Sequence, residues 1–129
     1  MRCLVALSVS GWSLILVSTS CTGVTQPQDI TFPDSNVSYV RHMQPFLSLS
    51  CANGGCHDKT SPAGGVDLTD YSGLLFGRGN LVVPNEPDQS LLIQSIEQRI
   101  AHPYDIMSRV TDNQRRGVRQ WILEGALHN

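Results

Sequence analysis

Apolar residues recur at helical spacing along much of the chain, and no sustained alternation of polar and apolar positions predicts a sheet. The first such segment places Val40, Met43 and Leu47 on one helical face. Asn36 precedes it and is a residue type that is favoured at helix N-caps. Pro45 lies inside the pattern and has no backbone N–H to donate, so this helix is expected to kink or restart there.

Two shorter helices are predicted in the middle of the chain. One covers Thr69–Phe76 and ends at Gly77. Asp88 can cap the next. The inward positions are Tyr71, Leu74 and Leu75 in the first and Leu91, Leu92, Ser95 and Ile96 in the second.

The last predicted helix has the clearest start. Thr111 and Gln114 have the spacing of a capping box, and Gly125 supplies a stop. The apolar positions between them at helical spacing are Val118, Trp121 and Ile122. Together these segments predict a mainly α domain of three to five helices and long loops, with Trp121 in the core.

The N-terminus has the layout of an export signal. Arg2 precedes a mostly apolar stretch, Leu4–Val17, which is too short to cross a bilayer. We therefore predict that residues 1–20 are a signal peptide that is removed, that residues 21–35 form a tether, and that residues 36–129 form the domain.

The predicted signal ends in V-S-T-S-C, which resembles the lipobox of bacterial lipoproteins. The resemblance implies acylation of Cys21 and a lipid anchor, whereas an ordinary cleaved signal would leave Cys21 as a free thiol. Thr22 does not resemble the aspartate that retains lipoproteins of enteric bacteria, which favours the outer membrane. Within the tether, Ile30 and Phe32 are expected to pack on the domain as an extended arm.

Charge and composition narrow the classes of function. The 129 residues carry a formal net charge of −2, and Lys59 is the only lysine, which argues against a nucleic-acid binder. Residues 1–20 hold 12 of the 52 apolar residues, which leaves 40 among the 109 residues that follow, a modest share for a domain that must bury a core of its own. A prosthetic group or a crosslink would help it to fold.

Cys51, Cys56 and His57 form the motif C-A-N-G-G-C-H. In an exported chain this is a disulfide, part of a zinc site, or a covalent haem attachment. A zinc site lacks a fourth ligand at the usual spacing. Haem attachment usually has the spacing C-x-x-C-H, and Gly54-Gly55 can loop out the two extra residues because glycine accepts positive φ. From these residues alone, both a disulfide and a covalent haem attachment remain possible interpretations of the motif.

The segments around the motif resemble the exported c-type cytochrome domains described as planctomycete-type. The matching segments are residues 37–51 (V-S-Y-V-R-H-M-Q-P-F-L-S-L-S-C), 64–71 (G-G-V-D-L-T-D-Y), 82–92 (V-V-P-N-E-P-D-Q-S-L-L) and 115–126 (R-R-G-V-R-Q-W-I-L-E-G-A). The resemblance implies a class I cytochrome c-like fold around one haem c. Cys51 and Cys56 would form the thioethers, and His57 would be the proximal iron ligand.

The resemblance also implies a methionine as the distal ligand. The M-P-P of the family appears here as Ile106-Met107-Ser108, with the proline earlier, at Pro103. Met107 is the only methionine after the motif and is the predicted distal ligand. His102 is the alternative, and it would give bis-histidine ligation.

These features predict an electron carrier and not an enzyme: a monohaem c-type cytochrome on the periplasm-facing surface of a membrane, serving separate redox proteins. The alternatives are a haem protein with an open sixth site, for peroxidase activity or gas sensing, and a haem-free, disulfide-stapled lipoprotein that binds a partner. Four arginines near Met107 are either a docking patch for an acidic partner or an ordinary solvated face. They are Arg109, Arg115, Arg116 and Arg119.

Overall fold

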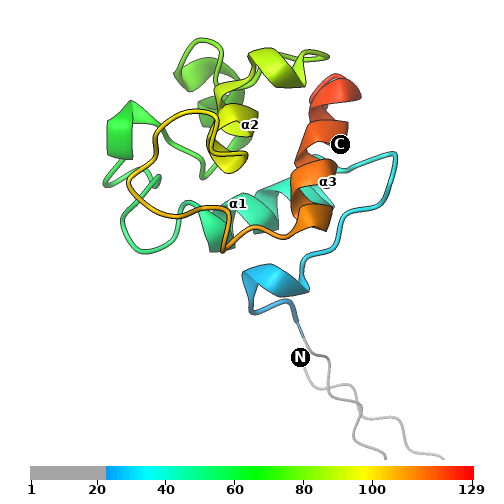
Figure 1. The fold of residues 1–129 in the computed structure, drawn as a ribbon, viewed down its shortest axis with the longest axis horizontal. Coiled ribbons are helices and arrows are strands. Elements are labelled where there is room, and N and C mark those ends of the chain that lie inside the picture. The colour runs from blue at the N-terminus through cyan, green and yellow to red at the C-terminus, as the bar shows by residue number, and fades with distance from the viewer. Residues whose placement is uncertain (1–22) are drawn as a thin grey trace, which may run out of the picture.

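The computed structural model describes residues 23–129 as a bundle of short helices joined by long loops (Figure 1). Three α-helices are present: α1 (Gln44–Ser50), α2 (Leu91–Ile96) and α3 (Asp112–Leu123). Single 3-10 turns cover Pro27–Asp29, Ala63–Gly65 and Pro87–Gln89, and π-helical turns cover Tyr39–Met43 and Gly73–Gly77. The described residues contain no strand, so the predicted mainly α class is confirmed.

The predicted leader and Cys21 lie outside the described residues. From residue 23 onward, no helix has both the length and the hydropathy that a membrane crossing requires.

The first helical segment begins later than predicted. Ser38 is its N-cap, with a side-chain oxygen that accepts a hydrogen bond from the backbone N–H of Arg41 at 3.2 Å. The prediction of Asn36 as the cap is wrong. Asn36 adopts a left-handed conformation, with φ 56°, and donates its backbone N–H to Glu124 Oε1 at 2.7 Å. A contact with the C-terminal helix therefore sets where the first helix starts.

The inward face of this segment is also shifted. Met43 and Leu47 are fully buried as predicted, but Val40 is 52% exposed and Tyr39 is buried in its place. The first turn, Tyr39–Met43, is π-helical, and its i→i+5 hydrogen bonds change the phase of the side chains. The predicted restart at Pro45 is confirmed, because Pro45 stands at the second position of α1 directly after the π turn.

Asp88 does not cap α2, contrary to the prediction. The N-cap is Ser90, whose hydroxyl accepts the Val83 N–H at 2.8 Å and donates to the Glu86 carbonyl at 3.0 Å. The Asp88 carboxylate instead pairs with Arg119 at 3.0 Å. An arginine from another helix thus competes with the local cap for this carboxylate.

The start and the end of α3 agree with the prediction. The backbone N–H of Gln114 donates to the Thr111 hydroxyl at 3.2 Å. The backbone N–H of Thr111 donates to Gln114 Oε1 at 3.0 Å. Trp121 is fully buried and donates its indole N–H to the Leu127 carbonyl at 3.0 Å. Gly125 follows the helix with φ 94°, a left-handed value that suits glycine.

The predicted packing of an N-terminal arm is confirmed. Ile30 and Phe32 are each only 5% exposed. The Asn113 side chain holds the backbone of Phe32 from both sides, accepting its N–H at 2.8 Å and donating to its carbonyl at 2.9 Å. The Gln114 amide donates to the Ile30 carbonyl at 3.0 Å. Side chains of α3 therefore hold the arm in place.

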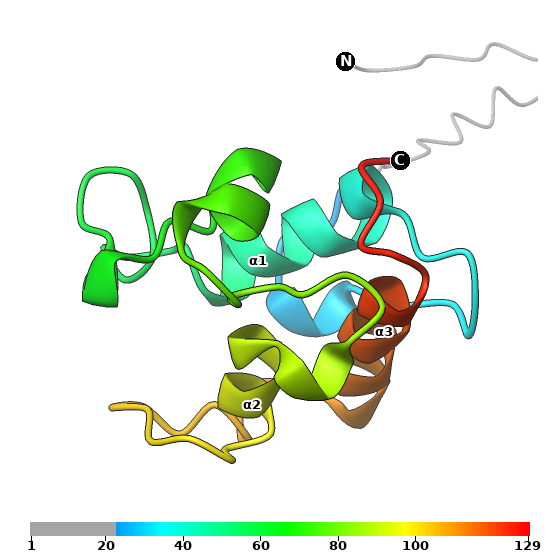
Figure 2. The same ribbon diagram turned by 90° about the horizontal axis from the view of Figure 1, so that it is seen from above.

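The C-terminal end returns to the start of the first helix (Figure 2). The Asn129 carbonyl accepts the Val40 N–H at 3.1 Å and the Ser38 hydroxyl at 2.7 Å. The ring of Tyr39 lies 5.9 Å from that of Trp121. These contacts join both ends of the domain on the side away from the motif loops.

Glu124 offers a test of this long-range join through pH. It accepts the N–H groups of Asn36 and Val37 at 2.7 and 2.8 Å, and a third bond from Gln120. Burial acts to raise the pKa of Glu124, but the hydrogen bonds outweigh it and hold the pKa below its ordinary value. A carboxylate with a lowered folded pKa stabilises the fold above its unfolded pKa of about 4.3, and this contribution disappears as pH falls through the folded value.

We expect Glu124→Gln to lower the free energy of unfolding at neutral pH by about 1–2 kcal/mol. The difference from wild type should shrink as pH falls below about 4. Denaturant melts across this range measure it, with the exposed Glu86→Gln as the control. A difference that does not change with pH would contradict the assignment.

Candidate functional site

The motif C-A-N-G-G-C-H forms a tight loop directly after α1. Cys51 is the C-cap residue, and its N–H donates to the Leu47 carbonyl at 2.9 Å. Gly54 and Gly55 have φ values of 69° and 81°, as expected for residues that loop out of a longer motif. The His57 N–H then donates to the Cys51 carbonyl at 3.2 Å and closes the loop. The first cysteine and the histidine are thus brought together.

His57 is fixed on both sides of its backbone and at its ring. Its carbonyl accepts the Leu68 N–H at 2.9 Å, and it forms an isolated antiparallel bridge with Pro62. Its Nδ1 lies 3.3 Å from the Val66 carbonyl. Donation from Nδ1 to a carbonyl sets the tautomer and leaves Nε2 as the free donor atom, an arrangement usual for metal-binding histidines.

Both motif cysteines are free thiols. Cys51 is half-buried against the core. Burial, with a smaller contribution from the charge of Cys56, raises the pKa of Cys51 to about 12. The Cys51 thiol is therefore protonated at neutral pH, unlike the acidic thiols of thiol–disulfide oxidoreductases.

The sequence predicted the side chains of the motif but not the backbone groups that hold His57 in place. Val66 and Leu68 contribute a backbone carbonyl and a backbone N–H, which any residue type could supply, so the sequence carries no signal for them. The Ser50 hydroxyl, next to Cys51, is buried and has no hydrogen-bond partner among the described residues. Such a group is unusual unless water or a bound molecule serves it.

The two candidate distal ligands lie in different surroundings, although both belong to the loop between α2 and α3. The His102 ring centroid is 6.1 Å from that of His57. Figures 1 and 2 show this loop and the motif loop at the same end of the molecule, away from α3. Met107 is 42% exposed, and its carbonyl accepts a hydrogen bond of 3.5 Å from Arg115. The predicted Met107–iron bond stays a prediction.

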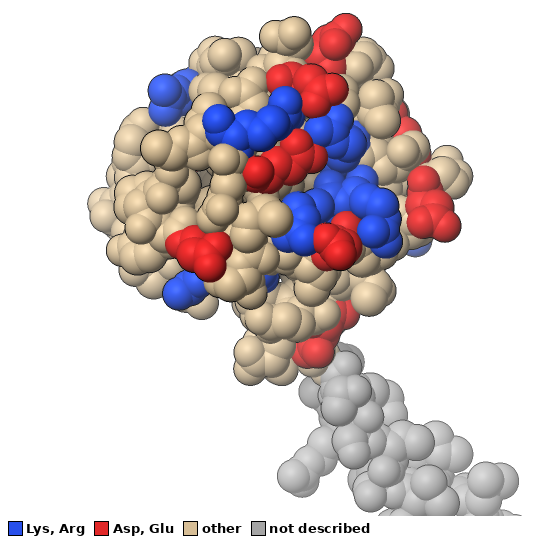
Figure 3. All heavy atoms as spheres, viewed as in Figure 1, with Lys and Arg blue, Asp and Glu red and all other residues tan. Residues whose placement is uncertain are grey.

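Met107 borders a surface hollow of about 270 Å³ at the start of α3. The other lining residues are Glu97, Asp112, Arg115, Arg116 and Arg119. This face carries most of the predicted arginine patch, but acidic side chains are interleaved with the basic ones (Figure 3). Arg115 pairs with Asp112, so the patch is less positive than the arginines alone imply.

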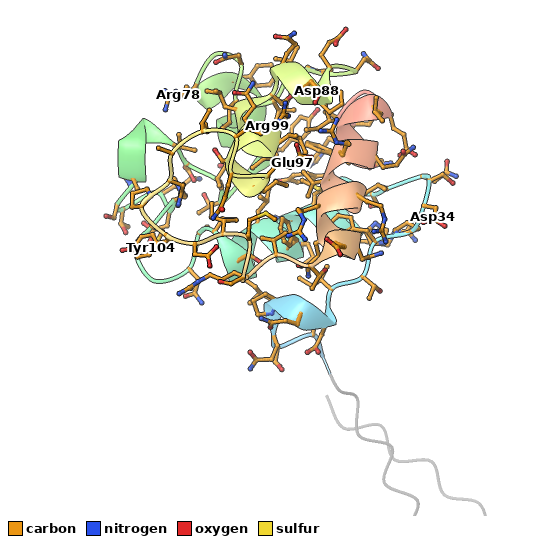
Figure 4. All side chains as sticks on the ribbon, viewed as in Figure 1. Asp34, Arg78, Asp88, Glu97, Arg99 and Tyr104 are labelled. Carbon is orange, nitrogen blue, oxygen red and sulfur yellow. The ribbon has the colours of Figure 1, made fainter. Side chains whose placement is uncertain are left out.

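The acidic groups come from residues that sequence reasoning did not connect with the patch. Arg119 bonds to Glu97 at 2.9 Å and to Asp88 at 3.0 Å. Arg99 reaches the same two carboxylates, at 3.0 and 3.1 Å, and the three labelled residues Asp88, Glu97 and Arg99 lie close together in Figure 4. These pairs are partly exposed, and each stabilises the fold only slightly.

The donor set fits a covalently attached haem. Two free thiols stand in one short loop with an imidazole whose Nδ1 already has a carbonyl partner. Cys51 and Cys56 would carry the thioethers, and His57 would bind the iron through Nε2. Within residues 23–129, no group of three or more His, Cys, Asp and Glu side chains is arranged to hold a metal ion by itself.

Comparison with known proteins gives one match. Residues 54–103 match the family model described as Planctomycete cytochrome C. The match includes Cys56, His57 and His102, begins after Cys51 and ends before Met107. No curated protein and no solved structure matches the chain. Residues 54–103 are therefore similar to the planctomycete-type cytochrome c family, and haem c is the cofactor that this similarity implies.

Proposed function

We propose that this protein is a monohaem electron carrier that works in the exported compartment. The observation that carries the proposal is the joining of Cys51, Cys56 and His57 in one closed loop, within a domain that matches a cytochrome c family. Haem iron supplies one-electron chemistry when it is bound, and the protein sets its ligands and its access to solvent.

The residues of the chain have distinct tasks in this proposal. The two cysteines hold the cofactor to the end of α1, so that it stays attached through both oxidation states. Val66, by accepting from His57 Nδ1, keeps the imidazole in one tautomer and one orientation. The hydrogen bonds of His57 to Cys51 and Leu68 tie the proximal ligand to two separate segments, which limits its movement during electron transfer.

The location and partners are part of the same proposal. A lipid on Cys21 would hold the domain at the periplasm-facing surface of a membrane, and the arm from Pro27 to Phe32 would fix where the tether leaves the domain. The electron donor and acceptor would be separate proteins. The arginine patch with its paired acids would dock a partner with mixed charges, and its contribution should weaken with salt.

The experiment is a visible spectrum and an intact mass of protein exported together with haem-maturation machinery. We expect a c-type reduced-minus-oxidised spectrum and a mass that exceeds that of the polypeptide by one haem. A colourless product with a Cys51–Cys56 disulfide would overturn the proposal. Reversible reduction by one electron per haem, measured by redox titration, distinguishes a carrier from a protein that turns over peroxide.

A further inference from the structure

Granted the proposed function, we propose that His102 and not Met107 is the distal iron ligand, so that two imidazoles hold the haem. The inference rests on the positions of three side chains in two loops: His57 after α1, and His102 and Met107 between α2 and α3.

The first observation is the separation of the two rings. The centroids of His57 and His102 are 6.1 Å apart. Two imidazoles that bind opposite sides of one metal ion have centroids about 6 Å apart, since each metal–nitrogen bond is about 2.0 Å long and each ring adds about 1 Å. The spacing of the two rings is thus that of a shared metal ion.

The second observation is that both rings use the same nitrogen for the protein. His57 Nδ1 lies 3.3 Å from the Val66 carbonyl. His102 Nδ1 lies 3.3 Å from both the carbonyl and the N–H of Tyr104, so it can donate to the first or accept from the second. Within the described residues, Nε2 has no hydrogen-bond partner in either ring. Nε2 is therefore the nitrogen available to a metal ion in both rings. When Nε2 of His102 binds a metal ion, Nδ1–H can donate to the Tyr104 carbonyl, as metal-binding histidines commonly do with their second nitrogen.

The third observation concerns the backbone at His102. Pro103 follows it and restricts His102 to extended conformations, which lowers the entropy lost when the ring is held in place. Family similarity also extends through His102 and Pro103 and stops there.

Met107 has none of these features. Its side chain is 42% exposed and borders the hollow at the start of α3, among the ion pairs of Arg115 and Arg119. Moving its sulfur to the iron would require the loop to leave these contacts. The His102 ring already lies at the 6.1 Å centroid spacing from His57.

The test compares His102→Ala with Met107→Leu in full-length protein exported with haem-maturation machinery. Intact mass is measured first, because covalent attachment depends on the cysteines and not on the distal ligand. Wild type without haem would refute the proposed function; wild type with haem allows the ligand to be tested separately. His128→Gln, in the C-terminal tail, controls for the loss of a histidine elsewhere.

We expect ferric wild type, Met107→Leu and His128→Gln to be low-spin with the signature of two imidazoles. His102→Ala should lose the low-spin spectrum, bind carbon monoxide when reduced, and recover the low-spin spectrum when imidazole is added. His102→Met should keep a sixth ligand and raise the reduction potential, because a thioether favours the reduced iron.

One measurement on wild type needs no variant. Methionine ligation gives a strongly upfield methyl resonance in the proton spectrum of the reduced protein, and we expect none. That resonance in wild type, or a low-spin spectrum lost in Met107→Leu and kept in His102→Ala, would overturn the inference. A low-spin spectrum unchanged by both substitutions would overturn it as well, since a third residue would then be the ligand.

Discussion

The double variant Cys51→Ser/Cys56→Ser is expected to leave the export pathway without covalent haem, with an intact mass equal to that of the polypeptide. Serine keeps the size of each side chain and removes the sulfur atoms that form thioethers. Each single variant should retain one thioether and lower the yield of attached haem. Haem-stained gels and intact mass measure the yield, and the expected effect of the double variant is complete loss.

Lys59→Gln is the matched control for this experiment. Lys59 lies three residues after Cys56, and its exposed ion pair with Asp70 contributes little to stability. The control should carry haem at the wild-type level. Covalent haem in the double variant would mean that other residues attach the cofactor, and the assignment of the motif would have to be given up.

Gly117→Ala is expected to release the N-terminal arm from α3 and to lower the free energy of unfolding by about 2–3 kcal/mol. A Cβ atom at this position would lie 2.1 Å from Cγ of Phe32, far inside van der Waals contact. Alanine is preferred over glycine inside a helix by about 1 kcal/mol, so the clash acts against a favourable change in propensity. Denaturant melts of the exported protein give the difference directly.

A double-mutant cycle distinguishes the clash from a general weakening of the helix. The added Cβ would also lie 2.2 Å from Cβ of Phe32, so the partner variant must be Phe32→Gly, which removes both the ring and the Cβ. In that background Gly117→Ala should cost nothing further, which gives a coupling of at least about 1 kcal/mol. Gly79→Ala is the control, because a Cβ there meets no atom within 4 Å. Additive losses at Phe32 and Gly117 would show that the two residues do not meet.

The local signals in the sequence predicted the elements that depend on neighbouring residues. The capping box of Thr111 and Gln114 is satisfied by residues three apart, and the α3 start follows from it alone. Pro45 restarts the helix wherever that helix packs, because the missing N–H belongs to the residue itself. Gly54 and Gly55 take left-handed conformations in the motif loop for the same kind of reason.

Two of the three wrong predictions have a tertiary cause. Asn36 stands two residues before the actual N-cap, Ser38, and its backbone is held by Glu124 from the far end of the chain. Asp88 does not cap α2, because Arg119 pairs with its carboxylate. Val40 points to solvent because the first turn is π-helical. In the first two cases a charged partner from α3 or its end outcompetes a local interaction of similar strength.

The amino-acid sequence by itself determined the chemistry of this protein: two thiols and an imidazole in one short motif, a mainly helical chain, and the start of α3. These depend on covalent neighbours and on residue types. Tertiary structure alone decided that Val66 orients His57, that His102 stands beside His57, and that Met107 lies among the arginines. Such pairings join segments far apart in the chain, and the folding of the whole core, with its loss of chain entropy, determines which of them form.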